Sequence, residues 1–314
     1  MLRALERWRV RCSRERVGAA LVFHRLGEPP GDPTRELVPA LSPELAEAQL
    51  TRLCSRYRVV PPSELLEAVR RRRFGGRVPV AVTFDDDLPS HVDVAVPLLQ
   101  RLRIPAAFFL TGASLEQPQS FWWDDLQRAV DRRAAALAGL AAPEGARFAD
   151  ALAGAPGALR ASARAIEQAP PEERARVAAK LRELTEAEPG TSLDASGVRA
   201  LAEAGFEIGF HTRAHEPLPT VDDAELARAL EEGRAQLERV GGRPLRMLAY
   251  PHGRAGEREA KAAREAGFVC AFTGRPIAVR ADDDPFLLGR IEPSFDSVDV
   301  FEAQLGRALL AARG

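Results

Sequence analysis

The chain has 314 residues, of which 46% are apolar and 28% charged, as is typical of a globular protein with material for one large α/β domain or two smaller ones. Its formal net charge of −1 gives no overall field that would attract nucleic acid or an anionic membrane, so we expect no nucleic-acid partner. The three cysteines, Cys12, Cys54 and Cys270, are too few and too scattered for a disulfide framework or a thiolate metal site.

The first residues contain no apolar core of a secretory signal, because residues 1–12 mix charged and apolar side chains. No later segment is long and apolar enough to be a transmembrane helix. The expected location is therefore the cytoplasm, and an amphipathic helix over residues 1–12 lying on a membrane is the alternative.

Short apolar runs of strand length recur along the chain, separated by longer stretches with helical patterning. These strand candidates lie at residues 19–23, 78–84, 106–110, 206–210, 245–250, 268–272 and 286–291. Their alternation with helices predicts parallel strands joined by crossover connections. We expect a single α/β domain over residues 1–314, built as a distorted parallel (β/α) barrel of about seven strands.

Helix boundaries are signalled at several points. Ser42 before Pro43 predicts a capped helix start, and a second helix is expected from residues 220–223 through Arg239. A further helix is expected over residues 253–266. Residues 124–191 are rich in Ala, Arg and Glu, carry Gly and Pro punctuation and show no strand pattern. We interpret that stretch as an insertion of two or three helices packed on the main domain.

Polar residues follow several of the predicted strands. His24 ends the first, Asp85 and Asp86 end the second, His211 follows the fourth, and His252 comes shortly after the fifth. Because the carboxyl ends of the strands of a parallel barrel meet at one mouth, we expect these side chains to gather there.

Two segments supply the donor types of a divalent metal site. Asp85-Asp86-Asp87 offers adjacent carboxylates, and His211-Thr-Arg-Ala-His215 offers two imidazoles four residues apart. Two histidines and one carboxylate with open positions suit metal-assisted chemistry. Taken alone, the aspartate run could be a solvated turn that caps a helix, and the histidines could be hydrogen-bonded surface residues.

Together these segments resemble the metal-dependent polysaccharide deacetylases, which carry T-F-D-D and H-[S/T]-x-x-H motifs. The matching segments here are Thr83–Asp86 and His211–His215, with further similarity at Leu21–Arg25 (L-x-Y-H-R), Ala249–Gly253 (A-Y-P-Y-G) and Phe121–Asp124. The similarity extends over residues 17–295 and is weakest in the helical insertion.

The resemblance implies roles for these residues. Asp86, His211 and His215 would hold a divalent metal ion, usually zinc in the family, and Asp85 would be the general base. The implied activity is removal of an N-acetyl or O-acetyl group from a sugar or polysaccharide, with a carbohydrate as the substrate partner. The oligomeric state is not predicted.

Two further roles follow from the same resemblance. The turn formed by Tyr250, Pro251 and His252 would supply a backbone donor to an oxyanion. The family's late histidine acid is missing from residues 286–291. In the branch that this chain resembles, a histidine on the first strand takes that place, which points to His24.

The chain also departs from the family pattern. Ala249 stands where many members have an arginine that orients the base, and Arg290 could substitute for it. Asp87 replaces the usual glycine after the two aspartates. His91 either lines the site or caps the helix that follows the aspartate run. Trp122 and Trp123 either stack on sugar rings or are buried against the insertion.

Two other functions are compatible with these residues. The same two histidines and carboxylate could hold Fe(II) in an oxygenase, although Asp85 beside the ligands favours hydrolysis. The departures at Ala249 and Asp87 and the missing late histidine would also fit a non-catalytic carbohydrate-binding relative.

Overall fold

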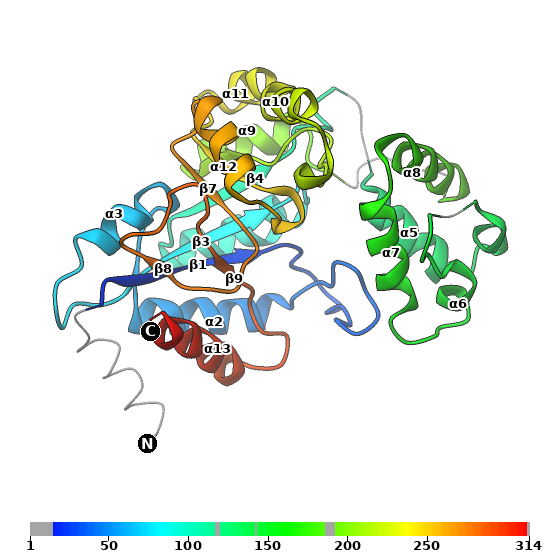
Figure 1. The fold of residues 1–314 in the computed structure, drawn as a ribbon. Coiled ribbons are helices and arrows are strands. Elements are labelled where there is room, and N and C mark those ends of the chain that lie inside the picture. Colours follow the sequence, from blue (N-terminus) through cyan, green and yellow to red (C-terminus); the bar gives the residue numbers. More distant parts are fainter. Residues whose placement is uncertain (1–14, 117–119, 142, 186–191, 313–314) are drawn as a thin grey trace.

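The structure is a computed structural model that describes residues 15–116, 120–141, 143–185 and 192–312 (Figure 1). The proposed amphipathic helix over residues 1–12 and Cys12 lie outside the described residues. Of the other cysteines, Cys54 is half-buried and Cys270 is buried, and both are free thiols. Within the described ranges, no helix combines the length and apolar character needed to cross a bilayer.

Within the part of the chain that the structure describes, nine strands form one sheet. They are β1 (Val17–Phe23), β2 (Arg58–Val59), β3 (Pro79–Asp85), β4 (Ala106–Leu110), β5 (Glu207–Phe210), β6 (Met247–Ala249), β7 (Cys270–Phe272), β8 (Val279–Arg280) and β9 (Arg290–Ile291). Seven of them run parallel in the order β7-β6-β5-β4-β3-β1-β9, while β2 adds a short parallel pair to β3 and β8 pairs antiparallel with β1. A bridge between Phe272 and Leu288 brings β7 beside the segment that leads into β9. The sheet is therefore a nearly closed, distorted parallel barrel, which confirms the predicted fold class.

The α-helices on the barrel are α2 (Pro43–Arg56), α3 (Leu65–Arg70), α4 (Val96–Leu102), α9 (Ala195–Glu203), α10 (Asp223–Glu231), α11 (Arg234–Gly241), α12 (Glu257–Glu265) and α13 (Val298–Ala311). Shorter helical turns are η1 (Pro62–Glu64), η2 (His91–Ala95), η4 (Leu218–Thr220) and η5 (Pro251–Gly253). Ser42 caps α2 as its sequence predicts, because its side chain accepts a hydrogen bond from the backbone of Leu45.

One predicted helix is divided in two. The segment expected to run unbroken from residues 220–223 through Arg239 is interrupted at Gly233, which has a φ of 79°. That conformation favours glycine, and a Cβ at this position would lie 3.0 Å from the side chain of Arg213. The helix expected over residues 253–266 starts later, at Glu257, because Gly253 belongs to the tight turn η5.

The strands alternate between two apolar layers. Ala19, Val80, Val82 and Phe84 pack in the large cluster shared with the outer helices. The residues of the inner cluster face the opposite way along the same strands, as expected for a period of two. They are Ala20, Ala81, Ala107, Phe109, Met247, Ala249, Phe272 and Leu288, joined by Leu65, Leu66 and Val69 around α3.

The barrel interior is filled rather than hollow. A Cβ at Gly209 would lie 2.3 Å from the ring of Phe109, so glycine leaves the space that this ring occupies. Gly18, at the start of β1, likewise has Val69 of α3 against it. Helix α3 thus covers the amino-terminal end of the barrel and leaves the carboxyl-terminal end for the polar residues.

The described part of the segment predicted as an insertion of two or three helices contains no strand; it holds four α-helices, more than predicted, and one shorter helical turn, joined by loops. It contains α5 (Trp122–Asp131), η3 (Ala135–Gly139), α6 (Phe148–Leu152), α7 (Ala158–Gln168) and α8 (Pro171–Thr185). These helices pack around their own apolar cluster, which includes Leu126, Phe148, Ile166 and Leu181. Figure 1 shows them as a group of green helices at one side of the barrel.

Candidate metal centre and active site

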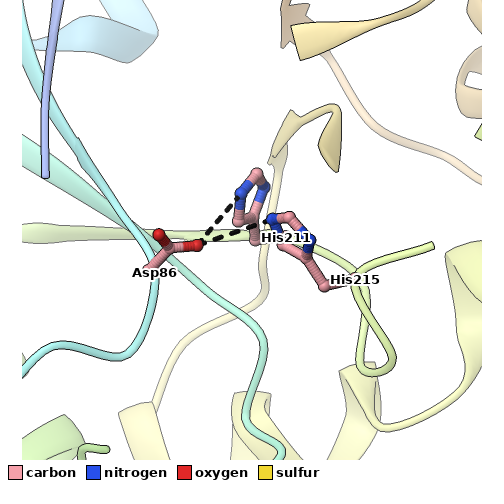
Figure 2. A group of neighbouring side chains, drawn as sticks. All are labelled: Asp86, His211 and His215. Atoms are coloured by element: carbon pink, nitrogen blue, oxygen red, sulfur yellow. Dashed lines mark ion pairs between the residues drawn. The ribbon is translucent and has the colours of Figure 1, made fainter. Parts of the chain in front are cut away.

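Asp86, His211 and His215 converge at the carboxyl-terminal end of the barrel (Figure 2). One carboxylate oxygen of Asp86, Oδ1, lies 3.7 Å from Nε2 of His211 and 3.5 Å from Nε2 of His215. The candidate ligand atoms of all three residues lie within 4.8 Å of one another. Donors about 2.1 Å from a tetrahedral zinc ion lie about 3.4 Å apart, so the spacing fits a small divalent cation.

The hydrogen bonding of these side chains also fits a metal. The Asp86 Oδ1 atom is buried and has no hydrogen-bond partner among the described residues. The Nδ1 atom of His211 lies 2.8 Å from the carbonyl oxygen of Ala249, which favours a proton on Nδ1 and leaves the Nε2 lone pair free for a ligand. A buried acceptor without a donor is costly, and a cation would remove that cost.

Two of the three candidate ligands have unusual backbone conformations. The φ angles of Asp86 and His215 are 73° and 50°, in the left-handed region that non-glycine residues rarely adopt. Asp86 follows β3 directly, and His215 ends the loop that begins where β5 stops. Strain of this kind persists only where the surrounding structure imposes it, so both side chains are held in place by the barrel.

Burial shifts the protonation of the candidate ligands. It lowers the pKa of His211 to about 4, and it lowers the pKa of His215 well below its ordinary value, assisted there by His252. Both rings are therefore neutral near pH 7, which is the form that binds metal. Burial also raises the pKa of Asp86, as do the nearby carboxylates of Asp85 and Asp87. A bound cation would oppose that rise.

Asp85 lies beside the candidate ligands and is paired with Arg290. Two nitrogens of the Arg290 guanidinium each lie 2.6 Å from an oxygen of Asp85, and the same group contacts the Thr83 hydroxyl and the Thr273 carbonyl. Asp85 Oδ2 is also 3.9 Å from His211 Nε2. Burial is the largest single influence and would raise the pKa of Asp85, but the charge and hydrogen bonds of Arg290 together with the nearby His211 and His24 outweigh it and lower the value to about 2. Asp85 is therefore ionised at neutral pH.

His24 lies in the same cavity as Asp85 and Arg290, directly after β1. Burial lowers the pKa of its imidazole, and the charge of Asp85 opposes that effect. The structure thus brings the first-strand histidine to the side of the site that holds the Asp85–Arg290 pair.

Asp87 and His91 do not line the cavity that holds these groups. The Asp87 carboxylate accepts hydrogen bonds from the backbone N–H and the hydroxyl of Thr111, and its carbonyl accepts one from Leu193. The ring of His91 is fully buried against the rings of Phe84 and Phe108, with centroid distances of 5.5 and 5.2 Å. Asp87 therefore joins neighbouring loops, and His91 packs in the core.

Tyr250, Pro251 and His252 form the turn after β6 that was predicted to supply an oxyanion donor. Of these three residues, only His252 lines the cavity. Tyr250 is fully buried, its hydroxyl donates to the carbonyl of Phe286, and its N–H donates to Phe272. Pro251 is buried and has no N–H to donate. His252 lines the cavity, and among the described residues no hydrogen bond engages its backbone N–H.

A cavity of about 710 Å³ surrounds these groups. On the barrel side it is lined by His24, Asp85, Asp86, His211, His215 and Arg290, and on the opposite side by residues of the 33–39 loop and of the insertion. Trp123 packs its ring 4.6 Å from that of His215 and is buried, while Trp122 is half-buried at the cavity wall. The insertion also contributes Glu167, which no sequence signal singled out.

The chain matches the family described as polysaccharide deacetylase over residues 75–137 and 173–271, just over half of its length. The interval between these two segments falls within the helical insertion. No curated protein matches the sequence.

Solved structures of similar fold cover most of the chain. The deacetylase PplD of Streptococcus pyogenes, in complex with acetate, has a TM-score of 0.60 at 14% identity over 93% of this chain and 98% of its own. IcaB from Ammonifex degensii has a TM-score of 0.60 at 20% identity over 92% and 97%. A polysaccharide deacetylase from Bacillus cereus has a TM-score of 0.59 at 16% identity over 93% and 69%. At these identities the likeness shows a shared fold, and it is the sequence match that shows that the chain belongs to the polysaccharide deacetylase family.

Proposed function

We propose that this protein is a metal-dependent hydrolase that removes the acetyl group from an N-acetylated or O-acetylated sugar, with zinc as the preferred ion. The observation that carries the proposal is the placement of an ionised carboxylate, Asp85, beside the candidate ligand set of Asp86, His211 and His215. A proton acceptor next to a metal-bound water is what hydrolysis requires.

The chemistry divides between the ion and the side chains. When bound, a divalent ion lowers the pKa of a coordinated water and polarises a carbonyl. Asp85 would take the proton from that water, and the bidentate contact with Arg290 would keep the carboxylate ionised and in one orientation. Asp86 would serve as a ligand, because its Oδ1 atom faces both histidines.

We assign the two remaining roles, stabilising the oxyanion and protonating the leaving group, to His252 and His24. Attack on the acetyl carbonyl places negative charge on its oxygen, and the N–H of His252 would donate to it. An amine leaves poorly as an anion, so an acid must protonate the nitrogen, and His24 is the candidate on the Asp85–Arg290 side of the cavity. The presence of His24 in this cavity supports a catalytic protein over a carbohydrate-binding relative.

The direct test measures acetate released from a panel of N-acetylated and O-acetylated sugars and short oligosaccharides. We expect release from at least one substrate, loss of release on treatment with a chelator, and recovery when zinc is added. Release that is unaffected by thorough metal removal would contradict the proposed mechanism, and a requirement for oxygen would point to the Fe(II) alternative.

A further inference from the structure

One carboxylate of the insertion contacts the active-site turn of the barrel. Glu167, on α7, has Oε1 3.4 Å from Nδ1 of His252 and Oε2 3.1 Å from Nη2 of Arg254. Its side chain is only 16% exposed. Burial would raise the pKa of Glu167, but the neighbouring His252, Arg254 and Arg164 together outweigh it and hold that pKa below its ordinary value. The contact is thus made by an ionised, largely buried group.

His252 is enclosed on several sides. Its ring stands edge-on to that of His215, with centroids 4.6 Å apart and planes at 75°, and the ring of Trp123 lies 6.4 Å away. Its backbone has a φ of 56°, in the left-handed region. A strained residue whose ring is packed against a candidate metal ligand needs an external contact to fix its side chain, and Glu167 makes that contact.

The contact also favours one protonation form of the ring. Because an ionised carboxylate can only accept, the 3.4 Å distance from Glu167 favours a proton on Nδ1 of His252. The ring is then tied at one end to α7 and packed at the other against His215, whose own Nδ1 has no hydrogen-bond partner among the described residues. Movement of the His252 ring would therefore alter both its own peptide plane and the packing of His215.

We propose that Glu167 is a positioning residue of the active site, which fixes His252 and thereby the backbone N–H that faces the acetyl oxygen. This inference rests on the proposed deacetylase function. It makes the helical insertion a part of the active site rather than a separate lobe.

The test compares three variants with the zinc-saturated wild type. Glu167→Ala removes the acceptor and should lower kcat about tenfold or more, with KM and zinc stoichiometry little changed, because misplacing a stabilising group by about 1 Å acts on the transition state. Glu167→Gln keeps an acceptor oxygen of the same reach and should recover most of the loss. Arg174→Ala removes another contact between the insertion and the barrel, at Thr220, away from the cavity, and should leave kcat near that of the wild type.

A second readout does not depend on turnover. With only five histidines in the chain, nitrogen NMR of the imidazoles can assign the protonated nitrogen of each. His252 should carry its proton on Nδ1 in the wild type and lose that preference in Glu167→Ala. An unchanged kcat or an unchanged His252 tautomer in that variant, or an equal fall of kcat in Arg174→Ala, would overturn the inference. If no sugar releases acetate in the wild type, the proposed function fails while the NMR result still decides whether Glu167 positions His252.

Discussion

Arg290 and Asp85 are 205 residues apart in sequence, yet they form a bidentate ion pair inside the barrel. Their side chains are 2% and 4% exposed. Asp85 ends β3 and Arg290 begins β9, and both strands flank β1. The pair therefore joins two strands across the first strand and fixes the candidate base at the mouth of the barrel.

Replacing Arg290 with methionine should shift the pH dependence of activity. The lowered pKa of Asp85, about 2, depends on the charge of Arg290, and burial alone would raise it. The base would then be protonated at higher pH, so the acid limb of the kcat/KM profile should move upward in pH. An acid limb in the same place as that of the wild type would contradict the assignment of Asp85 as base.

The same substitution should also lower stability. A buried carboxylate left without its partner costs about 3–5 kcal/mol, measurable by urea unfolding at neutral pH. Because the folded pKa of Asp85 is depressed, its contribution to stability is present above its unfolded pKa and is lost as pH falls toward 2. The double variant Asp85→Asn with Arg290→Met, which leaves no unpaired charge, should be more stable than Arg290→Met alone.

His24→Gln should separate amide from activated ester hydrolysis. Loss of a general acid should lower amide hydrolysis about 10²–10⁴-fold, because an amine leaves only when its nitrogen is protonated. An activated aryl acetate, whose phenolate leaves without a proton, should be much less affected. The measurement is the ratio of the two rates in each protein. Equal losses on both substrates would show that His24 is not the acid.

His215→Ala should abolish high-affinity zinc binding. The wild type should hold one zinc ion per chain, and a chelator should lower its melting temperature because the ion binds the folded state preferentially. The matched control is His91→Phe, since His91 packs between two phenylalanine rings. That control should keep its zinc. Full zinc occupancy in His215→Ala, measured by elemental analysis, would exclude His215 as a ligand.

Asp87→Gly, which installs the residue that the family pattern has after the two aspartates, should destabilise this protein without removing the metal. The Asp87 carboxylate accepts two hydrogen bonds from Thr111, and deleting it leaves buried donors unsatisfied at a cost of about 1–3 kcal/mol. Unfolding in urea gives the stability difference, and zinc content gives the control. A variant as stable as the wild type would show that these bonds contribute nothing net.

Much of the fold was predictable because its signals are local. The run at residues 106–110 became β4 with the same bounds, and the other six apolar runs each contain or overlap a strand. The two strands that sequence reasoning missed, β2 and β8, have two residues each and no room for a pattern. The break at Gly233 coincides with a glycine in the left-handed region, a helix-ending signal that the sequence prediction did not use.

The candidate site was predictable where motif and topology agree. Asp86 and His211 each follow a parallel strand. Because the carboxyl ends of these strands meet at one mouth of the barrel, the two side chains were expected to lie close together. Many family members have an arginine at the position of Ala249 that orients the base. The contact of Arg290 with Asp85 was predicted only because Arg290 could take the place of that arginine. Glu167 could not be found from sequence, because a glutamate in an alanine-rich helix carries no local sign that the helix covers the site.

The most direct test of the account is the Asp85→Asn variant, assayed for acetate release on the best substrate of the panel together with its zinc content. We predict one zinc ion per chain, as in the wild type, with kcat reduced about 10²-fold or more, because the ligands remain and only the proton acceptor is lost. Substantial turnover with zinc bound would contradict the role of Asp85 as the base and with it the central claim.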